Sequence, residues 1–226
     1  VQNHKLNIIH FHNGTGGGVL SVIRNLLAYS KNENICNHII FTIEKEVCAN
    51  YIPPEIKGAV SVQVFYYSQK NNFYYTCKQL AKLLPDDKAI IVAHDWLELG
   101  MVSNLGLQNP VVQMVHGDYD YYYELAKKHA SSIDTFITVA ASIANKLKIL
   151  IPDRAEDITY LRFPVPENKG TIEKHDGFSI IFIGRCTREK GYNVLPEIAK
   201  AFIEGGQKVF WHIVGEIDEK TKTQYL

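Results

Sequence analysis

Short apolar stretches alternate with amphipathic segments along most of this chain. The first apolar stretch, 5–12, stops at a glycine-rich turn, and the segment after it carries apolar residues at helical spacing: Val19, Val22, Ile23, Leu26 and Leu27. The same alternation predicts further strands over 37–43, 60–67, 89–93, 110–115, 135–139 and 158–163. Between them it predicts helices over 73–84, 95–105, 121–130 and 142–151.

These predicted strands are nearly continuous in apolar residues, which indicates a parallel sheet covered on both faces. We therefore expect an α/β fold whose first domain, residues 1–163, is a doubly wound, Rossmann-like layer. Residues 164–177 are rich in proline, glycine and charge, as in a linker. Residues 178–226 are the start of a second Rossmann-like domain. We expect this domain to be incomplete, because the two strands predicted in it would form only a marginal sheet.

Composition narrows the classes of function. The 226 residues are 46% hydrophobic and 21% charged, and 24 basic residues balance 24 acidic ones. A general nucleic-acid binder normally carries a basic excess, so we expect no nucleic-acid partner. No apolar run reaches the ~18–20 residues of a membrane span, which leaves peripheral membrane contact open.

The amino terminus lacks the layout of a signal peptide, and the four cysteines lack CxxC spacing or a companion histidine pair. We therefore expect a cytoplasmic protein with free thiols and no metal site. A P-loop and a GxSxG nucleophile elbow are also absent from the sequence.

The glycine-rich turn, 14–18, joins a predicted strand to a helix. Backbone amides at such a helix start favour an anion such as a phosphate or diphosphate, although a plain tight turn would also tolerate glycine. A dinucleotide fingerprint would need a third glycine where Val19 stands. Glu44, at the end of the second predicted strand, could still bind a ribose, so a dinucleotide-dependent oxidoreductase stays an alternative.

A basic turn occupies the corresponding place after the strand at 178–183. Arg185 and Lys190 lie five residues apart across this turn, so both cationic groups could converge on one anion. A solvated charged loop is the structural alternative.

Two histidines follow buried strands at the edge where open α/β sheets bind ligands. His94 and Asp95 end one strand and His116 ends the next, so imidazoles from both could hydrogen-bond a polar substrate. Asp95 is also a suitable helix N-cap. Tyr119 begins a tyrosine-rich segment that could stack on a sugar ring or simply pack on its own sheet.

The order of these motifs resembles glycosyltransferase family 4, the retaining, sugar-nucleotide-dependent enzymes of the GT-B fold. The similarity covers the whole chain and rests on the glycine turn, His94-Asp95-Trp96, His116, Thr138-Val-Ala-Ala-Ser142, Phe163-Pro-Val-Pro and Phe182-Ile-Gly-Arg-Cys-Thr-Arg-Glu-Lys-Gly191. It implies two Rossmann-like lobes, with an unknown carbohydrate or lipid-linked acceptor on the first and a nucleotide-sugar donor on the second. No further cofactor is implied.

The resemblance also implies roles for single residues. Gly16 and Gly17 would bring backbone amides to the donor diphosphate, and Arg185 and Lys190 would stabilise its developing charge. His116 would lie beside the transferred sugar as the catalytic residue.

His94, Asp95 and Tyr119 are the candidates for binding the acceptor or the sugar. They stand at the sheet edge that the resemblance assigns to the acceptor side.

One departure from the family pattern concerns its later glutamate pair, spaced E-x7-E. Glu216 and Glu219 have the wrong spacing and come too early. We therefore expect an amino-terminal fragment of a longer transferase that is inactive alone. A non-catalytic nucleotide- or sugar-binding module would use the same cleft and remains a further alternative.

Overall fold

The computed structural model describes residues 5–15, 17–30, 32–85, 88–167, 170 and 178–215. The chain divides into two compact units, Val1–Glu167 and Asn168–Leu226. Residues 164–167, predicted as the start of the linker, belong with the first unit, where the Asn25 side-chain amide donates to the Pro164 carbonyl at 3.0 Å. Positions 168–169 and 171–177 of the predicted linker lie outside the described residues.

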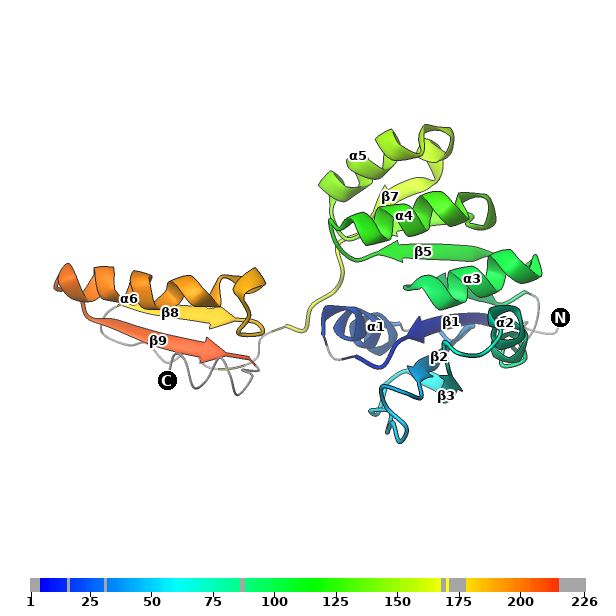
Figure 1. The fold of residues 1–226 in the computed structure, drawn as a ribbon, viewed down its shortest axis with the longest axis horizontal. Coiled ribbons are helices and arrows are strands. Elements are labelled where there is room, and N and C mark those ends of the chain that lie inside the picture. Colours follow the sequence, from blue (N-terminus) through cyan, green and yellow to red (C-terminus); the bar gives the residue numbers. More distant parts are fainter. Residues whose placement is uncertain are drawn as a thin grey trace. The chain divides into compact units, whose positions relative to one another are not determined.

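The first unit is a seven-stranded parallel sheet with the order β3-β2-β1-β4-β5-β6-β7 (Figure 1). The order turns back between β1 and β4, which is the topological switch point of a doubly wound sheet. The α/β class and the doubly wound parallel sheet are therefore confirmed. The strands are β1 (Leu6–His12), β2 (Ile35–Glu44), β3 (Ala59–Tyr67), β4 (Ile90–Ala93), β5 (Val111–Val115), β6 (Thr135–Thr138) and β7 (Ile158–Tyr160).

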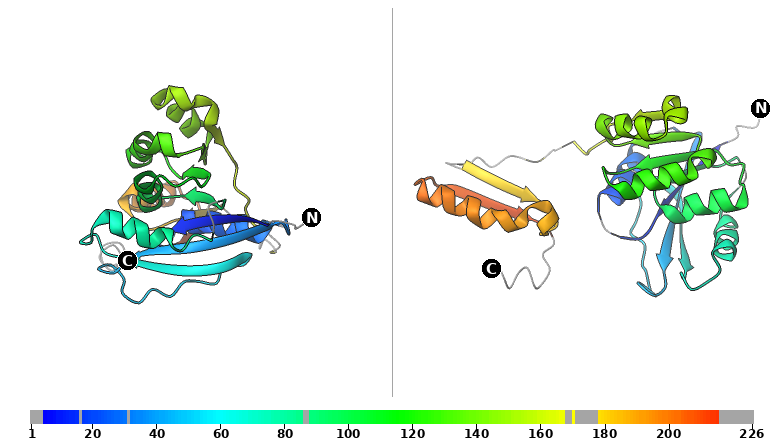
Figure 2. Two further views of the ribbon diagram at one scale, coloured as in Figure 1. Left: turned by 90° about the vertical axis from the view of Figure 1, so that its right-hand side faces the viewer. Right: turned by 45° about the horizontal axis from the view of Figure 1, so that its top comes forward.

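Helices cover both faces of this sheet. On one face α2 to α5 follow one another along the sheet, with α3, α4 and α5 stacked in both views of Figure 2. On the other face α1 packs on β2 through Ile23 and Leu27. The helices of the first unit are α1 (Gly18–Tyr29), α2 (Phe73–Ala81), α3 (Trp96–Leu105), α4 (Asp120–His129) and α5 (Ala141–Leu150), with 3-10 turns η1 (Ala130–Ser132) and η2 (Pro152–Asp157).

Strand β2 shows why its residues occupy the centre of the unit. Ile39, Phe41 and Ile43 point to the α1 face, whereas Ile40 belongs to the core under α2 to α5. Because both faces of the strand are buried, its sequence is apolar almost throughout instead of alternating. β7 ends at Tyr160, earlier than the predicted Phe163.

The second unit contains one parallel pair of strands joined by a helical connection. Its elements are β8 (Phe178–Ile183), η3 (Arg188–Lys190), η4 (Tyr192–Val194), α6 (Leu195–Glu204) and β9 (Val209–Val214). α6 runs along the two strands, and its Phe202 ring meets the Trp211 ring of β9 at 6.3 Å (Figures 1 and 2). The described residues of the second unit thus form a parallel strand–helix–strand arrangement.

In the described parts of both units, no helix has the length and apolar character needed to cross a bilayer.

Candidate functional site

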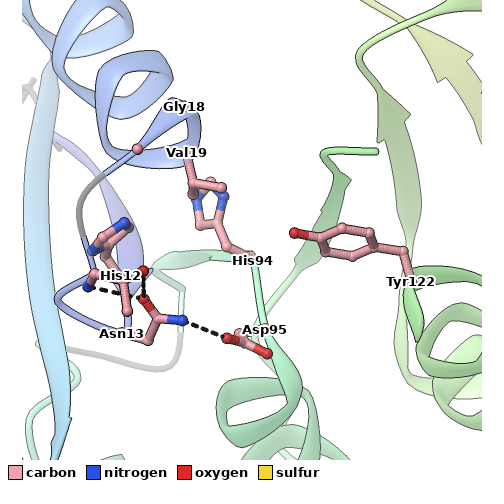
Figure 3. Close-up of a pocket in the computed structure, with 9 residues that line it drawn as sticks. His12, Asn13, Gly18, Val19, His94, Asp95 and Tyr122 are labelled. Atoms are coloured by element: carbon pink, nitrogen blue, oxygen red, sulfur yellow. Dashed lines mark hydrogen bonds between the residues drawn. The ribbon is translucent and has the colours of Figure 1, made fainter. Parts of the chain in front are cut away.

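A pocket opens at the switch point of the first unit, where the carboxyl ends of β1 and β4 diverge. Its volume is about 140 Å³. The described residues that line this switch-point pocket are His12, Asn13, Thr15, Gly17, Gly18, Val19, His94, Asp95 and Tyr122 (Figure 3). Ligands of doubly wound proteins bind in this crevice because the loops from β1 and β4 leave in opposite directions there.

The amino-terminal end of α1 forms one wall of the pocket. Gly17 is the N-cap, and no side chain caps the helix or places an acidic group in its first turn. A Cβ built on Gly17 or Gly18 would meet no atom within 4 Å, so space is open in front of these amides. Uncapped amides and the positive end of the helix dipole together favour an anion. Gly16, predicted with Gly17, lies outside the described residues.

Gly14 fixes the turn that carries the chain from β1 to this helix. Its φ of +78° is in the left-handed region, and a Cβ there would lie 2.3 Å from Cδ1 of Ile43. The Gly14 amide donates to Nδ1 of His12 at 3.0 Å, which makes that nitrogen an acceptor. Glycine is therefore required here both for backbone conformation and for space.

Asp95 ties three elements together beside the pocket. Its carboxylate accepts hydrogen bonds from the Trp96 amide at 2.8 Å, the Asn13 side chain at 3.0 Å and the Tyr121 hydroxyl. The predicted N-cap role is confirmed, because Asp95 and Glu98 form a capping box at the start of α3. One carboxylate thus connects the β1 turn, α3 and α4.

Glu98 is a fully buried carboxyl group behind Asp95. Its Oε1 accepts from the backbone amides of His94 at 2.7 Å and Asp95 at 2.6 Å. Burial, reinforced by the nearby Asp95 charge, raises the pKa of Glu98 to about 8. The group is therefore mainly protonated at neutral pH and holds the turn without a formal charge.

Four histidines gather at the ends of β1, β4 and β5. His94 Nδ1 lies 2.6 Å from His116 Nε2, and the two rings stack with centroids 4.9 Å apart. The His10 ring lies 5.8 Å from that of His94 on its other side. The structure thus brings together His94 and His116, which the sequence placed at one sheet edge.

Burial lowers the pKa of His10, His12 and His116 to about 4. For His94, burial together with the neighbouring imidazoles places the pKa well below its usual value. All four rings are therefore neutral at pH 7 and act as hydrogen-bonding groups rather than as cations.

Neutrality makes the tautomers of His94 and His116 interdependent. A single hydrogen lies between His94 Nδ1 and His116 Nε2. The tautomer of His116 therefore decides which nitrogen of His94 is protonated, and so whether His94 Nε2 donates or accepts. Within the described part of the chain His94 Nε2 is buried and has no partner. His94 lines the pocket, whereas His116 reaches it only through His94.

The tyrosines of α4 divide between the pocket and the surface. Tyr122 lines the pocket, and its hydroxyl points toward His94 in Figure 3. Tyr119, the sequence candidate, is 63% exposed and is not among the lining residues; its ring lies over Gly117, where a Cβ would come within 2.6 Å of it.

Sequence reasoning did not single out His12, Asn13 or Glu98. Glu98 had a readable signal, since Asp95 followed three residues later by a glutamate is a capping-box pattern.

The basic turn of the second unit follows β8. Gly184 and Gly191 have φ values of +153° and +77°, and the side chains of Arg185 and Lys190 are exposed. Gly215 directly follows β9, and a Cβ on it would lie 1.8 Å from the Gly184 carbonyl oxygen. The two strand ends therefore approach each other as closely as glycine allows.

Comparisons with known proteins complete this description. No model of a protein family matches the chain, and no curated protein does. Among solved structures, it is similar to the apo form of the lipopolysaccharide outer core galactosyltransferase WaaB, with 15% identity, a TM-score of 0.49, and coverage of 97% of this chain and 62% of that one.

The chain is also similar to UDP-N-acetylglucosamine 2-epimerase from Rickettsia bellii, with 12% identity and a TM-score of 0.48. The match covers 99% of this chain and 65% of the epimerase. A further UDP-N-acetylglucosamine 2-epimerase shows 11% identity, a TM-score of 0.48, and coverage of 95% and 69%. The chain thus spans less than two thirds of the length of WaaB and of the Rickettsia bellii epimerase. Because these identities and TM-scores are low, we describe the fold and the site from the strands and side chains of this chain alone.

Proposed function

We propose that this chain is part of a retaining glycosyltransferase of family 4, which transfers a sugar from a nucleotide-diphosphate sugar to a carbohydrate or lipid-linked acceptor. The observation that supports this most is the uncapped amino end of α1, which opens into the switch-point pocket opposite a neutral His94. Such a pocket suits a ligand with a phosphate group joined to a hydroxyl-rich ring.

In this reaction the bond between the sugar C1 and the diphosphate oxygen breaks, and a bond from C1 to the acceptor oxygen forms. The acceptor hydroxyl proton leaves with the diphosphate, on which negative charge develops. No lysine or arginine is among the described residues lining the pocket, and its histidines are neutral. A helix end offers only about half an elementary charge, so the cations must come from elsewhere.

Arg185 and Lys190 are our candidates for these cations, because both are exposed on a turn at the carboxyl ends of β8 and β9. The neutral His94 ring would lie beside the transferred sugar, and His116 would fix its orientation through the hydrogen bond to Nδ1. The catalytic role predicted for His116 and the sugar contact predicted for Tyr119 remain predictions.

The α1 contribution can be tested by isothermal titration of UDP, GDP and their sugars against variants of Gly18. Gly18→Glu adds a carboxylate where space is open and where it suits the helix dipole, so it should leave folding intact. It should weaken the binding of the nucleotides about tenfold or more through repulsion, about 1.4 kcal/mol. The isosteric, uncharged Gly18→Gln is the matched control and should retain most of the affinity.

Equal affinities in these two variants would contradict the α1 diphosphate site. Arg185→Ala and Lys190→Ala should each weaken the same binding by roughly 1.5–3 kcal/mol. Unchanged affinity in both variants would contradict diphosphate binding by this turn.

Glu44 keeps the dinucleotide-dependent oxidoreductase as a second candidate, since it ends β2 beside the β1 turn and accepts a hydrogen bond from Gln69 at 2.9 Å. A titration with NAD is the discriminating measurement, because saturable binding of NAD without binding of nucleotide sugars would favour this alternative. Binding of nucleotide sugars without any transfer to acceptors would favour the non-catalytic module.

A further inference from the structure

A second, larger pocket adjoins the first at the ends of β1, β2 and β3. Its volume is about 370 Å³, within the roughly 300–1,000 Å³ usual for small-molecule sites. The described residues lining it are Asn13, Gly14, Thr15, Thr42, Ile43, Glu44, Val47, Cys48, Tyr51, Tyr67, Gln69, Asp95 and Trp96. Asn13, Thr15 and Asp95 line both pockets, so the two are neighbours along one sheet edge.

Aromatic side chains on fixed backbone contribute to the walls of this second pocket. The Tyr66 hydroxyl donates to the Tyr51 carbonyl at 3.3 Å and accepts from its amide at 3.0 Å, which anchors the loop after β2. Tyr67 meets Trp96 edge to face at 6.0 Å, and Phe73 stacks on the other side of Trp96 at 5.6 Å. Aromatic faces held in this way suit the apolar face of a sugar ring.

The polar groups of the second pocket are acceptors and amides rather than cations. Glu44 and Asp95 bring two carboxylates, and Gln69 and Asn13 bring amides that bond to them. No lysine, arginine or histidine is among the described lining residues. The Arg24 guanidinium nearby donates to the Glu55 carbonyl and does not line the pocket.

We propose that the second pocket binds an uncharged sugar residue of the acceptor and rejects phosphorylated sugars. This inference rests on the proposed function. Carboxylates and amides hydrogen-bond sugar hydroxyls, whereas a phosphate placed there would face Glu44 and Asp95 without a compensating cation. Because Asp95 lines both pockets, a sugar bound in the second would lie next to the first.

Cys48 provides a readout that does not depend on turnover, because its half-buried thiol lines the second pocket. Cys77 and Cys186 are buried, and Cys36→Ser removes the other half-buried thiol. The experiment follows the rate of N-ethylmaleimide labelling of Cys48 in the purified chain by peptide mass spectrometry. Matched probes are glucose, mannose and N-acetylglucosamine, each against its 6-phosphate.

We expect at least one neutral sugar to slow labelling about tenfold when the site is about nine-tenths occupied, and its 6-phosphate to give no protection. Glu44→Gln should reduce the difference in protection of Cys48 between the neutral sugar and its 6-phosphate, because it removes one of the two carboxylates. Glu46→Gln is the control, because Glu46 is exposed, bonds to Ser68 and does not line the pocket. Equal protection by both members of every pair, or protection by none, would overturn the inference.

The two proposals fail in different ways. If nucleotide sugars bind but no neutral sugar protects Cys48, only the acceptor pocket is wrong. If NAD binds and protects Cys48 while nucleotide sugars do not bind, the glycosyltransferase proposal itself is wrong and the inference falls with it.

Discussion

β1 and β8 both end in a glycine-containing turn that leads toward a helix, yet their surroundings differ. The last four residues of β1 are buried, and neighbouring strands pair with it on both sides. In β8, Ile180 and Phe182 are half-buried, whereas Ile181 and Ile183 on the opposite face are 59% and 72% exposed. The first turn thus follows a strand end that is buried on both faces, and the second follows a strand that is half-buried on one face only.

This difference extends to the chemistry at the two strand ends. After β1 and β4 the histidines are buried and neutral, and the half-buried Asp95 carboxylate is fixed by hydrogen bonds from Asn13 and Trp96. After β8 the groups are the exposed cations Arg185 and Lys190. The first unit therefore presents packed, hydrogen-bonded groups at its strand ends, whereas the second presents exposed cations.

The largest expected effect contrasts the two cores. Phe136 of β6 is fully buried and lies under the Arg154 guanidinium, so Phe136→Ala should lower the free energy of unfolding by about 3–5 kcal/mol. Phe182→Ala should lower the free energy of unfolding of its unit by less, because Phe182 is only half-buried. Trp96 lies in the first unit and Trp211 in the second, so urea unfolding of variants that keep only one of them reports each unit separately. Equal losses in both variants would contradict the contrast.

The histidine cluster should make the first unit sensitive to acid. In the range from about pH 4 to 6.5 the unfolded chain binds protons that folded His10, His12 and His116 do not, so stability is lost as the pH falls below 6.5. Glu98 acts in the opposite sense, since its raised pKa means that stability is lost as the pH rises from 4.5 to about 8.

Together these groups predict a stability maximum between pH 6.5 and 7. From pH 6.5 to 5.5 the histidines outweigh Glu98, and the free energy of unfolding should fall by about 1–2 kcal/mol. Unfolding curves monitored through Trp96 across this range provide the measurement. Glu98→Gln should remove the decline on the alkaline side, and a flat profile in the unmodified chain would disprove the assignment.

A smaller effect separates the two glycine turns. Gly14 and Gly191 have nearly the same φ, +78° and +77°, but a Cβ on Gly14 meets Ile43 whereas one on Gly191 meets only Val194 at 3.9 Å. Gly191→Ala should lower the free energy of unfolding by about 1–2 kcal/mol, because alanine is strained at this left-handed backbone conformation. Gly14→Ala should lower the free energy of unfolding by about 1 kcal/mol more than this, because its Cβ would also overlap Ile43. Thermal unfolding compares the two, and a larger loss at Gly191 would reverse the comparison.

Much of the fold could be predicted because buried parallel strands are readable as apolar runs. The same reasoning placed His94 and His116 at one sheet edge, since both directly follow such runs. The order β3-β2-β1-β4 could not be read, and it is this order that brings His12 beside Asp95. Tyr119 was chosen over Tyr122 because nearby positions differ only in helical phase, which packing decides.

Asp95 stands between the two pockets and is bonded to Asn13, which they also share. A ligand that shifts this carboxylate from one side alters the wall that the other ligand meets. Thermodynamic reciprocity then requires each ligand to change the other's affinity by the same factor. If Asp95 moves in this way, ligands of the two pockets bind cooperatively or antagonistically.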